Sequence, residues 1–318
     1  MSQPLVTVIC LCYNHQQFIR ETVESMVNQS YKNIQIIVAD DASDDTSVTE
    51  IKRLKDVYPA LELLLSSQNN GNCKAFNAAL KLAKGDFVID FATDDIMMPD
   101  RVQRQVDFFL IQHPVVGVVF TDAVYIDEEG INFRSHYAYL FKNKLLNHIP
   151  QGDVYRDVLA TYFIASPTMM MRRNVLEELN GFDENLVYED FDFWVRSARL
   201  FQYAFLNEQL TSIRRTNHSM STGWYVPGDR QLHSTYLVCK KAQHLNRDEG
   251  DRQALIVRVR YEFRQSVFSE NHIEANLFYE LLTELQGNKS ADFILHTINN
   301  LRLPLSPIRK WYHFLRYS

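Results

Sequence analysis

LVTVICLCYN, at residues 5–14, is a nearly continuous apolar run that ends in a polar Tyr-Asn pair. Such a run, without alternation between apolar and polar residues, is typical of a strand that is buried on both faces of a sheet. Similar runs follow at 34–39, 61–66, 87–91 and 115–126, and helical patterns separate them at 18–27, 46–57, 74–83 and 100–112. Strands separated by helices of this length predict an α/β fold with a mostly parallel, Rossmann-like sheet flanked by helices.

Composition limits the partners and the location of the chain. Its 318 residues are 46% hydrophobic, enough for one large core or for a core and a smaller helical domain. The formal net charge of -6 opposes a general phosphate-binding role, so we expect no nucleic-acid partner. We find no signal-peptide pattern and no apolar run of the roughly 18 to 20 residues that cross a membrane. We therefore expect a cytoplasmic protein whose membrane contact, at the inner face of the membrane, is at most peripheral.

The pattern changes twice along the chain. The segment 130–150 loses its periodicity and is expected to form a long aromatic loop. Beyond about residue 225 the pattern is helical. We expect a main domain over 1–222, with parts at 1–126 and 127–222, followed by a helical region over 223–318.

Three acidic clusters need an explanation. DDASDD occupies 40–45 after the second strand, Asp94-Asp95 follows the strand at 87–91, and EDFD occupies 189–192 at the start of an expected helix. Each cluster alone has an ordinary structural explanation, because Asp and Glu favour turns, helix caps and the first turn of helices. A calcium loop of EF-hand type at 40–45 is disfavoured, because no glycine occupies the sharp-turn position.

Together the three clusters fit one chemistry. A carboxylate of the first cluster can accept the imide N–H of a pyrimidine base. The Asp94-Asp95 pair can bind a hard cation, Mg²⁺ or Mn²⁺, which also takes diphosphate oxygens and neutralises a leaving nucleoside diphosphate. A carboxylate of the third cluster can act as a general base. Transfer of a sugar from a nucleotide sugar needs these three functions.

The ordered motifs resemble the inverting family 2 glycosyltransferases. The opening run and the stretch IIVADDASDDT at 36–46 look like that family's first signatures, although Ala42 stands where glycine is usual. ATDDIMMPDR at 92–101 is similar to its metal-binding segment, and GFDE at 181–184 and EDFDFWVR at 189–196 are similar to its acceptor-side motifs. The resemblance covers about residues 4–221. It implies the GT-A fold, with a nucleotide-sugar-binding part at 1–126, an acceptor-side part at 127–222 and a C-terminal helical extension.

The resemblance also implies roles for single residues on the donor side. Asp41 would bind the base, and Asp95 would bind the metal directly. The donor-binding residues that it implies are Leu11, Tyr13, Asp41, Lys74 and Asp94: the first two border the nucleoside, Lys74 lies near the base or diphosphate, and Asp94 lies beside the donor ribose and sugar.

On the acceptor side, the resemblance implies that Asp190 is the general base. It would remove the acceptor proton while the nucleotide leaves from the opposite face of C1, which inverts that carbon. Glu189, Asp192 and Trp194 would lie on the acceptor side as well.

The sequence departs from the family at one histidine. Many members have Arg-x-His shortly before Ser-x-Ser, whereas Thr216 occupies the histidine position here. His218 lies two residues further on. It is a candidate ligand of the metal or diphosphate, and the alternative is an ordinary loop histidine.

The resemblance implies an enzyme, a metal-dependent inverting glycosyltransferase with a UDP-sugar as the favoured donor. Its expected acceptor is a glycan or lipid-linked glycan in surface polysaccharide assembly. The alternative is a catalytically inactive sugar-nucleotide-binding module of the same fold. A nucleotidyltransferase and a nicotinamide-dependent dehydrogenase are disfavoured, because no glycine-rich loop follows a strand. A processive synthase is disfavoured because the chain lacks a Q-x-x-R-W motif and membrane helices.

The C-terminal segment 301–318 has a charge opposite to that of the whole chain. No acidic residue follows Asp292, whereas four basic residues do: Arg302, Arg309, Lys310 and Arg316. An apolar stripe with helical spacing runs through the same segment: Ile308, Trp311, Tyr312 and Leu315. This pattern indicates either peripheral contact with an anionic membrane or packing on the main domain or a partner chain.

Overall fold

The computed structural model describes residues 3–216 and 225–305. These residues form two compact units that interleave along the chain. The first unit contains the described residues within Met1–Val154, Phe163–Glu184 and Leu200–Thr222. The second unit contains the described residues within Tyr155–Tyr162, Asn185–Arg199 and Gly223–Ser318. The division into domains at residue 222 stays a prediction.

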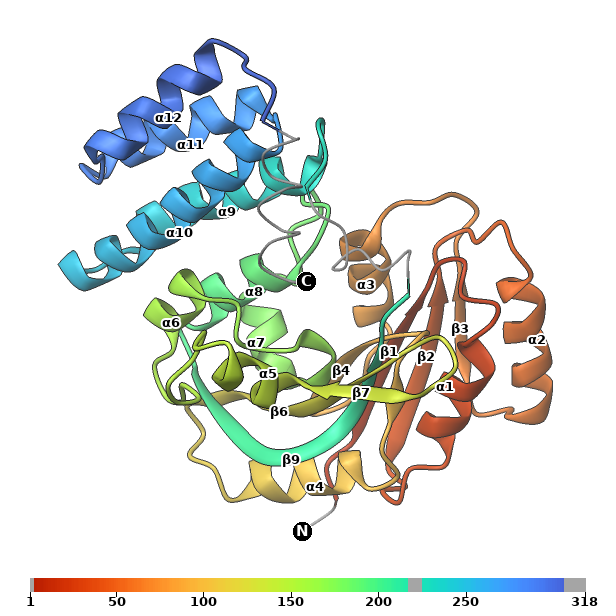
Figure 1. Ribbon diagram of the computed structural model, residues 1–318. Coiled ribbons are helices and arrows are strands. Elements are labelled where there is room, and N and C mark those ends of the chain that lie inside the picture. The colour runs from red at the N-terminus through yellow and green to blue at the C-terminus, as the bar shows by residue number, and fades with distance from the viewer. Residues whose placement is uncertain (1–2, 217–224, 306–318) are drawn as a thin grey trace. The chain divides into compact units, whose positions relative to one another are not determined.

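The described part of the first unit is built on a nine-stranded sheet with the order β3-β2-β1-β4-β8-β6-β9-β5, in which β7 also pairs with β6 (Figure 1). The strands are β1 Val6–Cys12, β2 Ile34–Asp40, β3 Glu62–Leu65, β4 Phe87–Ala92, β5 Ile96–Met97, β6 Val116–Ile126, β7 Asn132–Ser135, β8 Met170–Arg172 and β9 Gln202–Arg214. Every residue of β1 is buried, as expected for a strand covered on both faces.

Strand directions decide which ends lie together. β1 is parallel to β2 and β4, and β2 is parallel to β3. β8 is antiparallel to both β4 and β6, so β6 runs in the same direction as β4. β9 is parallel to β6. The carboxyl ends of β1, β2, β4, β6 and β9 therefore lie along one edge of the sheet, where open α/β sheets bind their ligands.

Amphipathic helices flank this sheet. They are α1 Ile19–Val27, α2 Ser47–Val57, α3 Asn72–Leu80 and α4 Arg101–Leu110, and three shorter elements follow in the same unit, namely α5 His136–Lys142, η1 Ser166–Thr168 and α7 Arg173–Glu178. In α4, Val102, Val106 and Phe109 recur at helical spacing and are fully or almost fully buried in the core beneath β1 and β4. Each such side chain contributes about 1.5–3 kcal/mol on burial. The expected α/β sheet flanked by helices is thereby confirmed.

The expectation of a loop over 130–150 is wrong for its first half. β7 pairs antiparallel with β6, and α5 follows it directly. Buried Tyr137 and Leu140 anchor α5, while Phe133 and Phe141 stay exposed. The helical period is hidden in the sequence because aromatic residues occupy both the buried and the exposed positions.

The second unit is helical in its described part, which confirms the helical pattern expected beyond residue 225. Its helices are α6 Tyr155–Ala160, α8 Asp190–Ser197, α9 Arg230–Leu245, α10 Glu249–Phe268, α11 His272–Glu284 and α12 Ser290–Asn300. The side chain of Asp229 caps α9, and that of Asp248 caps α10. Within the described ranges, every helix is too short or too polar to cross a membrane.

Candidate active site

Three neighbouring strands bring most of the predicted donor residues to one place. In the β1–β2 and β1–β4 ladders, Cys12 lies opposite Asp40 and Leu11 lies opposite Ala92. The chain leaves these strand ends at residues 13, 41 and 93. Tyr13, Asp41 and the Asp94-Asp95 pair therefore lie along the same sheet edge, which their distance in the sequence does not show.

Asp41 lies at the end of β2 and is almost fully buried. Its Oδ1 accepts a 2.9 Å hydrogen bond from the backbone N–H of Asn70, and its Oδ2 accepts one of 2.7 Å from the backbone N–H of Gly71. These bonds hold the carboxylate in one orientation and leave lone pairs for another N–H donor. The next residue, Ala42, has a φ of 60°, in the left-handed region that favours glycine. This conformation explains why glycine is usual at that position.

The other donor candidates of the first unit differ in exposure. Tyr13 is 46% exposed just beyond β1, whereas Leu11 is only 9% exposed within it. Lys74 is exposed in the first turn of α3. A lysine there adds its charge to the positive end of the helix dipole, an arrangement that favours a bound anion over a bound cation.

Asp95 is the most constrained carboxylate at this edge. It is 3% exposed, and its Oδ1 accepts a 2.9 Å hydrogen bond from the backbone N–H of Arg214. The hydroxyl of Thr22 donates to its backbone carbonyl at 2.8 Å. Burial, with a smaller contribution from the Asp94 carboxylate, raises the pKa of Asp95 well above its usual value. Arg215 and Arg101 offset only part of this shift, so a bound cation would further favour the ionised form.

A hard divalent cation fits this pair of carboxylates. Mg²⁺ and Mn²⁺ need only one or two protein carboxylates when waters and substrate phosphates complete their shell. Asp94 lies beside Asp95 and has an Oδ1 3.9 Å from Nδ1 of His15. Among the described residues, no group of three His, Cys, Asp or Glu side chains could hold a metal by itself. His218 lies outside the described residues, so its role as a ligand stays a prediction.

Arg214 holds the Asp94-Asp95 segment in place, and the sequence motifs assign it no role. Its guanidinium is buried and donates to the backbone carbonyls of Asp94, Asp127 and Glu128 at 2.9 to 3.0 Å. It also forms a 2.6 Å ion pair with Glu21 of α1. One side chain thus joins the loop after β4, the turn after β6 and a flanking helix. Arg214 lies at the end of β9, far along the chain from these partners, so only the folded structure shows this role.

In the second unit, α8 carries the four acceptor-side candidates at its N-terminal end and along its length. Asp190 begins the helix, after Glu189 as its N-cap, and both are partly buried. Asp192 is 1% exposed and lies in two ion pairs, with Arg196 at 2.6 Å and with Lys241 of α9 at 2.5 Å. These two ion pairs engage both oxygens of the Asp192 carboxylate.

Trp194 lies in the core of the second unit. It is 3% exposed, and its ring centre is 5.8 Å from that of Tyr162. Arg258 of α10 stacks on the ring of Tyr162, with its Cζ 3.9 Å from the ring centre. This packing fixes the ring of Trp194, and its acceptor-side role stays a prediction.

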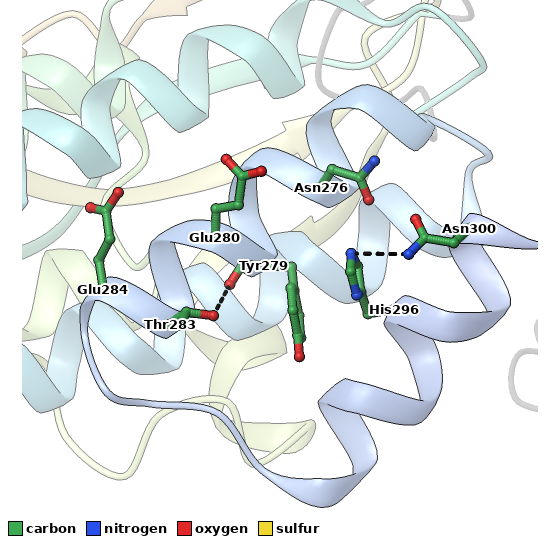
Figure 2. A pocket seen from close by; sticks show the side chains of 7 residues that line it. All are labelled: Asn276, Tyr279, Glu280, Thr283, Glu284, His296 and Asn300. Carbon is green, nitrogen blue, oxygen red and sulfur yellow. Dashed lines mark hydrogen bonds between the residues drawn. The ribbon is translucent and has the colours of Figure 1, made fainter.

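A groove of about 650 Å³ lies between α11 and α12, also in the second unit (Figure 2). The rings of Tyr279 and His296 stack in it with centres 3.8 Å apart. Asn300 lies 3.4 Å from Nε2 of His296. The groove contains none of the residues that the sequence motifs single out.

Comparison with known proteins connects this geometry to a family. The family model described as "Glycosyl transferase family 2" matches residues 7–179. The matched range includes Asp41, Asp94 and Asp95 and ends before Asp190.

Several curated proteins are similar over much of the chain. An uncharacterized glycosyltransferase of Haemophilus influenzae is 27% identical over 223 residues, which cover 69% of this chain and 68% of that protein. The putative teichuronic acid biosynthesis glycosyltransferase TuaG of Bacillus subtilis is 24% identical over 245 residues, covering 77% of this chain and 90% of TuaG. An uncharacterized glycosyltransferase of Rickettsia typhi is aligned over 64% of its length.

Two solved structures show a similar fold. S. aureus TarS 1–349 in complex with UDP-GlcNAc has a TM-score of 0.68 and 18% identity, covering 94% of this chain and 88% of that one. The mannosyltransferase PcManGT from Pyrobaculum calidifontis, in complex with GDP-Man and Mn²⁺, has a TM-score of 0.62 and 21% identity, covering 98% and 84%. At these identities the similarity is one of fold, and it confirms the GT-A architecture expected from the motifs.

Proposed function

This chain belongs to glycosyl transferase family 2, and on that basis we propose that it is a metal-dependent inverting enzyme that moves one or a few sugars from a nucleoside-diphosphate sugar to an acceptor hydroxyl. The observation that carries the proposal is the convergence of Tyr13, Asp41 and the Asp94-Asp95 pair on one sheet edge.

For the donor, we propose that Asp41 accepts the imide N–H of the base while Leu11 and Tyr13 border the nucleoside. The oriented and buried Asp41 carboxylate supports this role. Such a carboxylate accepts uracil or thymine, rejects cytosine, and tolerates guanine through its ring N–H. UDP is the favoured nucleotide. Lys74 then neutralises part of the diphosphate charge from the first turn of α3.

For the metal, we propose that Asp95 is a direct ligand of Mg²⁺ or Mn²⁺ and that Asp94 lies beside the donor ribose and sugar. A cation held there would neutralise charge on the leaving diphosphate. The raised pKa of Asp95 and its fixed orientation support this assignment, because both make a bound cation favourable. The Mn²⁺ in the PcManGT complex is consistent with such a site in a protein of similar fold.

For the chemical step, we propose that Asp190 removes the proton from the acceptor hydroxyl. The oxygen then attacks C1 as the bond from C1 to the diphosphate oxygen breaks, and a single displacement inverts C1. The engagement of Asp192 by Arg196 and Lys241 supports Asp190 over Asp192 as the base. Glu189 and Trp194 remain proposed acceptor-side residues.

For the acceptor, we propose a glycan or lipid-linked glycan in surface polysaccharide assembly, at the inner face of the cytoplasmic membrane. The similarity to a putative teichuronic acid biosynthesis enzyme supports this class. The segment 301–318 is proposed to mediate peripheral membrane contact or oligomer formation. Residues 306–318, which carry most of its apolar stripe, lie outside the described residues.

A panel of nucleotide sugars tests the proposal. The full chain is incubated with Mn²⁺ and each donor, and release of the nucleoside diphosphate is measured with and without excess chelator. We expect slow release from at least one donor, most from a UDP-sugar, and none in chelator. The alternative, an inactive sugar-nucleotide-binding module, predicts donor binding without release.

A further inference from the structure

Arg134 lies on β7 with its guanidinium close to two aromatic rings. Its Cζ is 4.4 Å from the ring centre of Tyr125 on β6 and 4.3 Å from that of Tyr139 on α5. Tyr125 is fixed in turn, because its hydroxyl lies 2.9 Å from Nδ1 of His136. Rings at such distances stack on a guanidinium, whose N–H groups point outward from its edge.

The edge of this guanidinium lacks a partner within the described residues. Arg134 forms no ion pair or side-chain hydrogen bond there, and its Nε is a buried nitrogen without an acceptor. Asp122, a buried carboxylate in this part of the sheet, already accepts hydrogen bonds from four other groups, namely the backbone N–H groups of Ala123 and Tyr137 and the side chains of Ser135 and Gln209. A buried donor without an acceptor costs free energy that a bound anion would recover.

A second guanidinium contacts the same ring. The Cζ of Arg215 is 4.6 Å from the ring centre of Tyr125. Two positive charges therefore lie against one tyrosine. Burial lowers the pKa of the neighbouring His136; the Phe163 carbonyl and the Asp122 carboxylate oppose that shift, and Arg134 and Arg215 add to it. Two guanidinium groups against one ring favour a further negative group beside them.

The strand pairing places this cluster at the proposed donor edge. Tyr125 lies opposite Arg134 on β7 and opposite Ile213 on β9. The next residue of β9, Arg214, donates its backbone N–H to Asp95. Across the sheet edge, Asp41 follows β2, Tyr13 follows β1, the Asp94-Asp95 pair follows β4, and the arginine cluster adjoins the ends of β6 and β9.

We infer that Arg134, assisted by Arg215, binds a carboxylate or phosphate substituent on the transferred sugar or on the acceptor sugar. The inference rests on the proposed function, in which the base lies near β2 and the diphosphate near the Asp94-Asp95 pair. Arg215 also acts on the Asp95 carboxylate, so the affinity for UDP itself is measured to distinguish an anion on a sugar from the diphosphate. A carboxylate or phosphate that meets the edge of a planar guanidinium can accept two parallel N–H hydrogen bonds from it.

Matched pairs of charged and neutral probes test this inference. The donor arm compares UDP-glucuronate with UDP-glucose in the presence of Mg²⁺. The acceptor arm compares methyl glucuronide with methyl glucoside, and glucose 6-phosphate with glucose, in the presence of UDP. Affinities are measured by calorimetry or ligand-observed NMR for the wild type, for Arg134→Gln and for Arg134→Lys. Tyr139→Leu removes one covering ring, and Arg53→Gln removes a charge from an arginine that is exposed on α2.

We expect the wild type to prefer the charged probe in one arm, and that arm identifies the source of the anion. Arg134→Gln should lower the affinity for the charged probe on the order of tenfold and leave the affinities for UDP and the neutral probes unchanged. Arg134→Lys should keep part of the preference, Tyr139→Leu should reduce it, and Arg53→Gln should not affect it. The preference should fall as salt is added.

Two results would overturn the inference. One is the absence of any charge preference in both arms of the wild type. The other is a folded Arg134→Gln variant whose affinities for charged probes, neutral probes and UDP all fall equally. That result would assign Arg134 a structural role or a role in binding the diphosphate. A wild type that binds no UDP or UDP-sugar but still prefers the charged sugars would count against the proposed donor and leave the Arg134 site supported.

Discussion

The backbone N–H of Arg214 donates a 2.9 Å hydrogen bond to Oδ1 of Asp95, although 119 positions separate the two residues. Within the described residues, Oδ2 of Asp95 accepts no hydrogen bond. One oxygen is thus used to orient the carboxylate, and the other is left for a ligand. Because a backbone group makes the orienting bond, a substitution at Asp95 can test the ligand role without removing the bond.

Asp95→Asn should reduce metal-dependent turnover on the order of a hundredfold or more, because an amide is a poor ligand for a hard cation. The carbonyl oxygen of Asn can still accept from Arg214. Since the charged form of Asp95 is disfavoured by burial, the variant should unfold at the same or a higher temperature than the metal-free wild type. Nucleoside diphosphate release and thermal unfolding with and without Mn²⁺ check both points.

The exposed Asp56 on α2 supplies the control for that experiment. Asp56→Asn should keep turnover, and Mn²⁺ with UDP should stabilise it as it does the wild type. Full turnover of the wild type in excess chelator would exclude a metal at Asp95.

Asp190→Asn should lower turnover by roughly 10² to 10⁴, the usual effect of losing a general base, and should leave donor affinity and stability near those of the wild type. Asp192→Asn should instead keep most of the turnover and lose stability. The substitution removes the two ion pairs that the buried carboxylate makes with Arg196 and Lys241, which should cost about 3 kcal/mol of stability. Single-turnover kinetics and denaturant unfolding separate the two effects. A normal rate in Asp190→Asn together with a slow one in Glu189→Gln would move the base to Glu189.

Asp41→Asn should reduce discrimination between UDP and CDP. The wild-type carboxylate accepts the N–H of uracil and repels the ring nitrogen of cytosine, whereas an amide can present either a donor or an acceptor. The ratio of the two affinities is the useful measurement, because loss of the bonds from Asn70 and Gly71 would also lower stability by about 1–3 kcal/mol. An unchanged ratio would remove Asp41 from base recognition.

Acidification should destabilise the first unit through His136. Its Nε2 lies 2.8 Å from the carbonyl oxygen of Phe163 and its Nδ1 lies 2.9 Å from the Tyr125 hydroxyl, an arrangement that suits the neutral ring. Burial lowers its pKa in the folded state. The stabilisation is therefore complete above the unfolded pKa of about 6.5 and is lost as the pH falls through the lower folded pKa.

Unfolding in denaturant at pH 7.5 and at pH 5.5 measures this loss. The difference between the two pH values should be smaller in His136→Gln than in the wild type. His148→Gln, at an exposed position, is the matched control and should retain the wild-type difference. An equal difference in all three proteins would assign the acid sensitivity to other groups.

A chain that ends at Asn300 should bind anionic vesicles more weakly than the full chain if the segment 301–318 contacts membrane. Each basic residue near the surface contributes about 1 kcal/mol, and added salt should weaken the binding. Co-sedimentation with anionic and with neutral vesicles decides this point. Equal binding by both chains would leave oligomer formation, measured by sedimentation velocity, as the remaining proposal for the segment.

The parallel half of the sheet was predictable from sequence because each of its strands is a local apolar run between helices. The expected strand at 34–39 is β2 Ile34–Asp40, and the expected helix at 100–112 is α4 Arg101–Leu110. β9 carries no such signal. Its first half mixes buried and exposed residues, and its ladder with β6 shifts register more than once, so neither a continuous apolar run nor a strict alternation appears.

The candidate site divides in the same way. Asp41 and the Asp94-Asp95 pair lie in contiguous motifs at strand ends, so the sequence predicts that they share an edge. Arg214 and Arg134 act through partners on other strands, and only the pairing of β6 with β7 and β9 brings those partners together. Long-range contacts of this kind have no local pattern from which they could be predicted.

The parallel pairing of β6 with β9 also has a consequence for biosynthesis. The ladder joins Val116 to Gln202 at one end and Ile126 to Arg214 at the other. A nascent chain therefore exposes one edge of β6 on the ribosome until the last of these residues has emerged. Such an open, apolar edge is a site for intermolecular pairing. Fragments that stop before β9 should aggregate during expression, and a chaperone that shields this edge should increase the yield of soluble full-length protein.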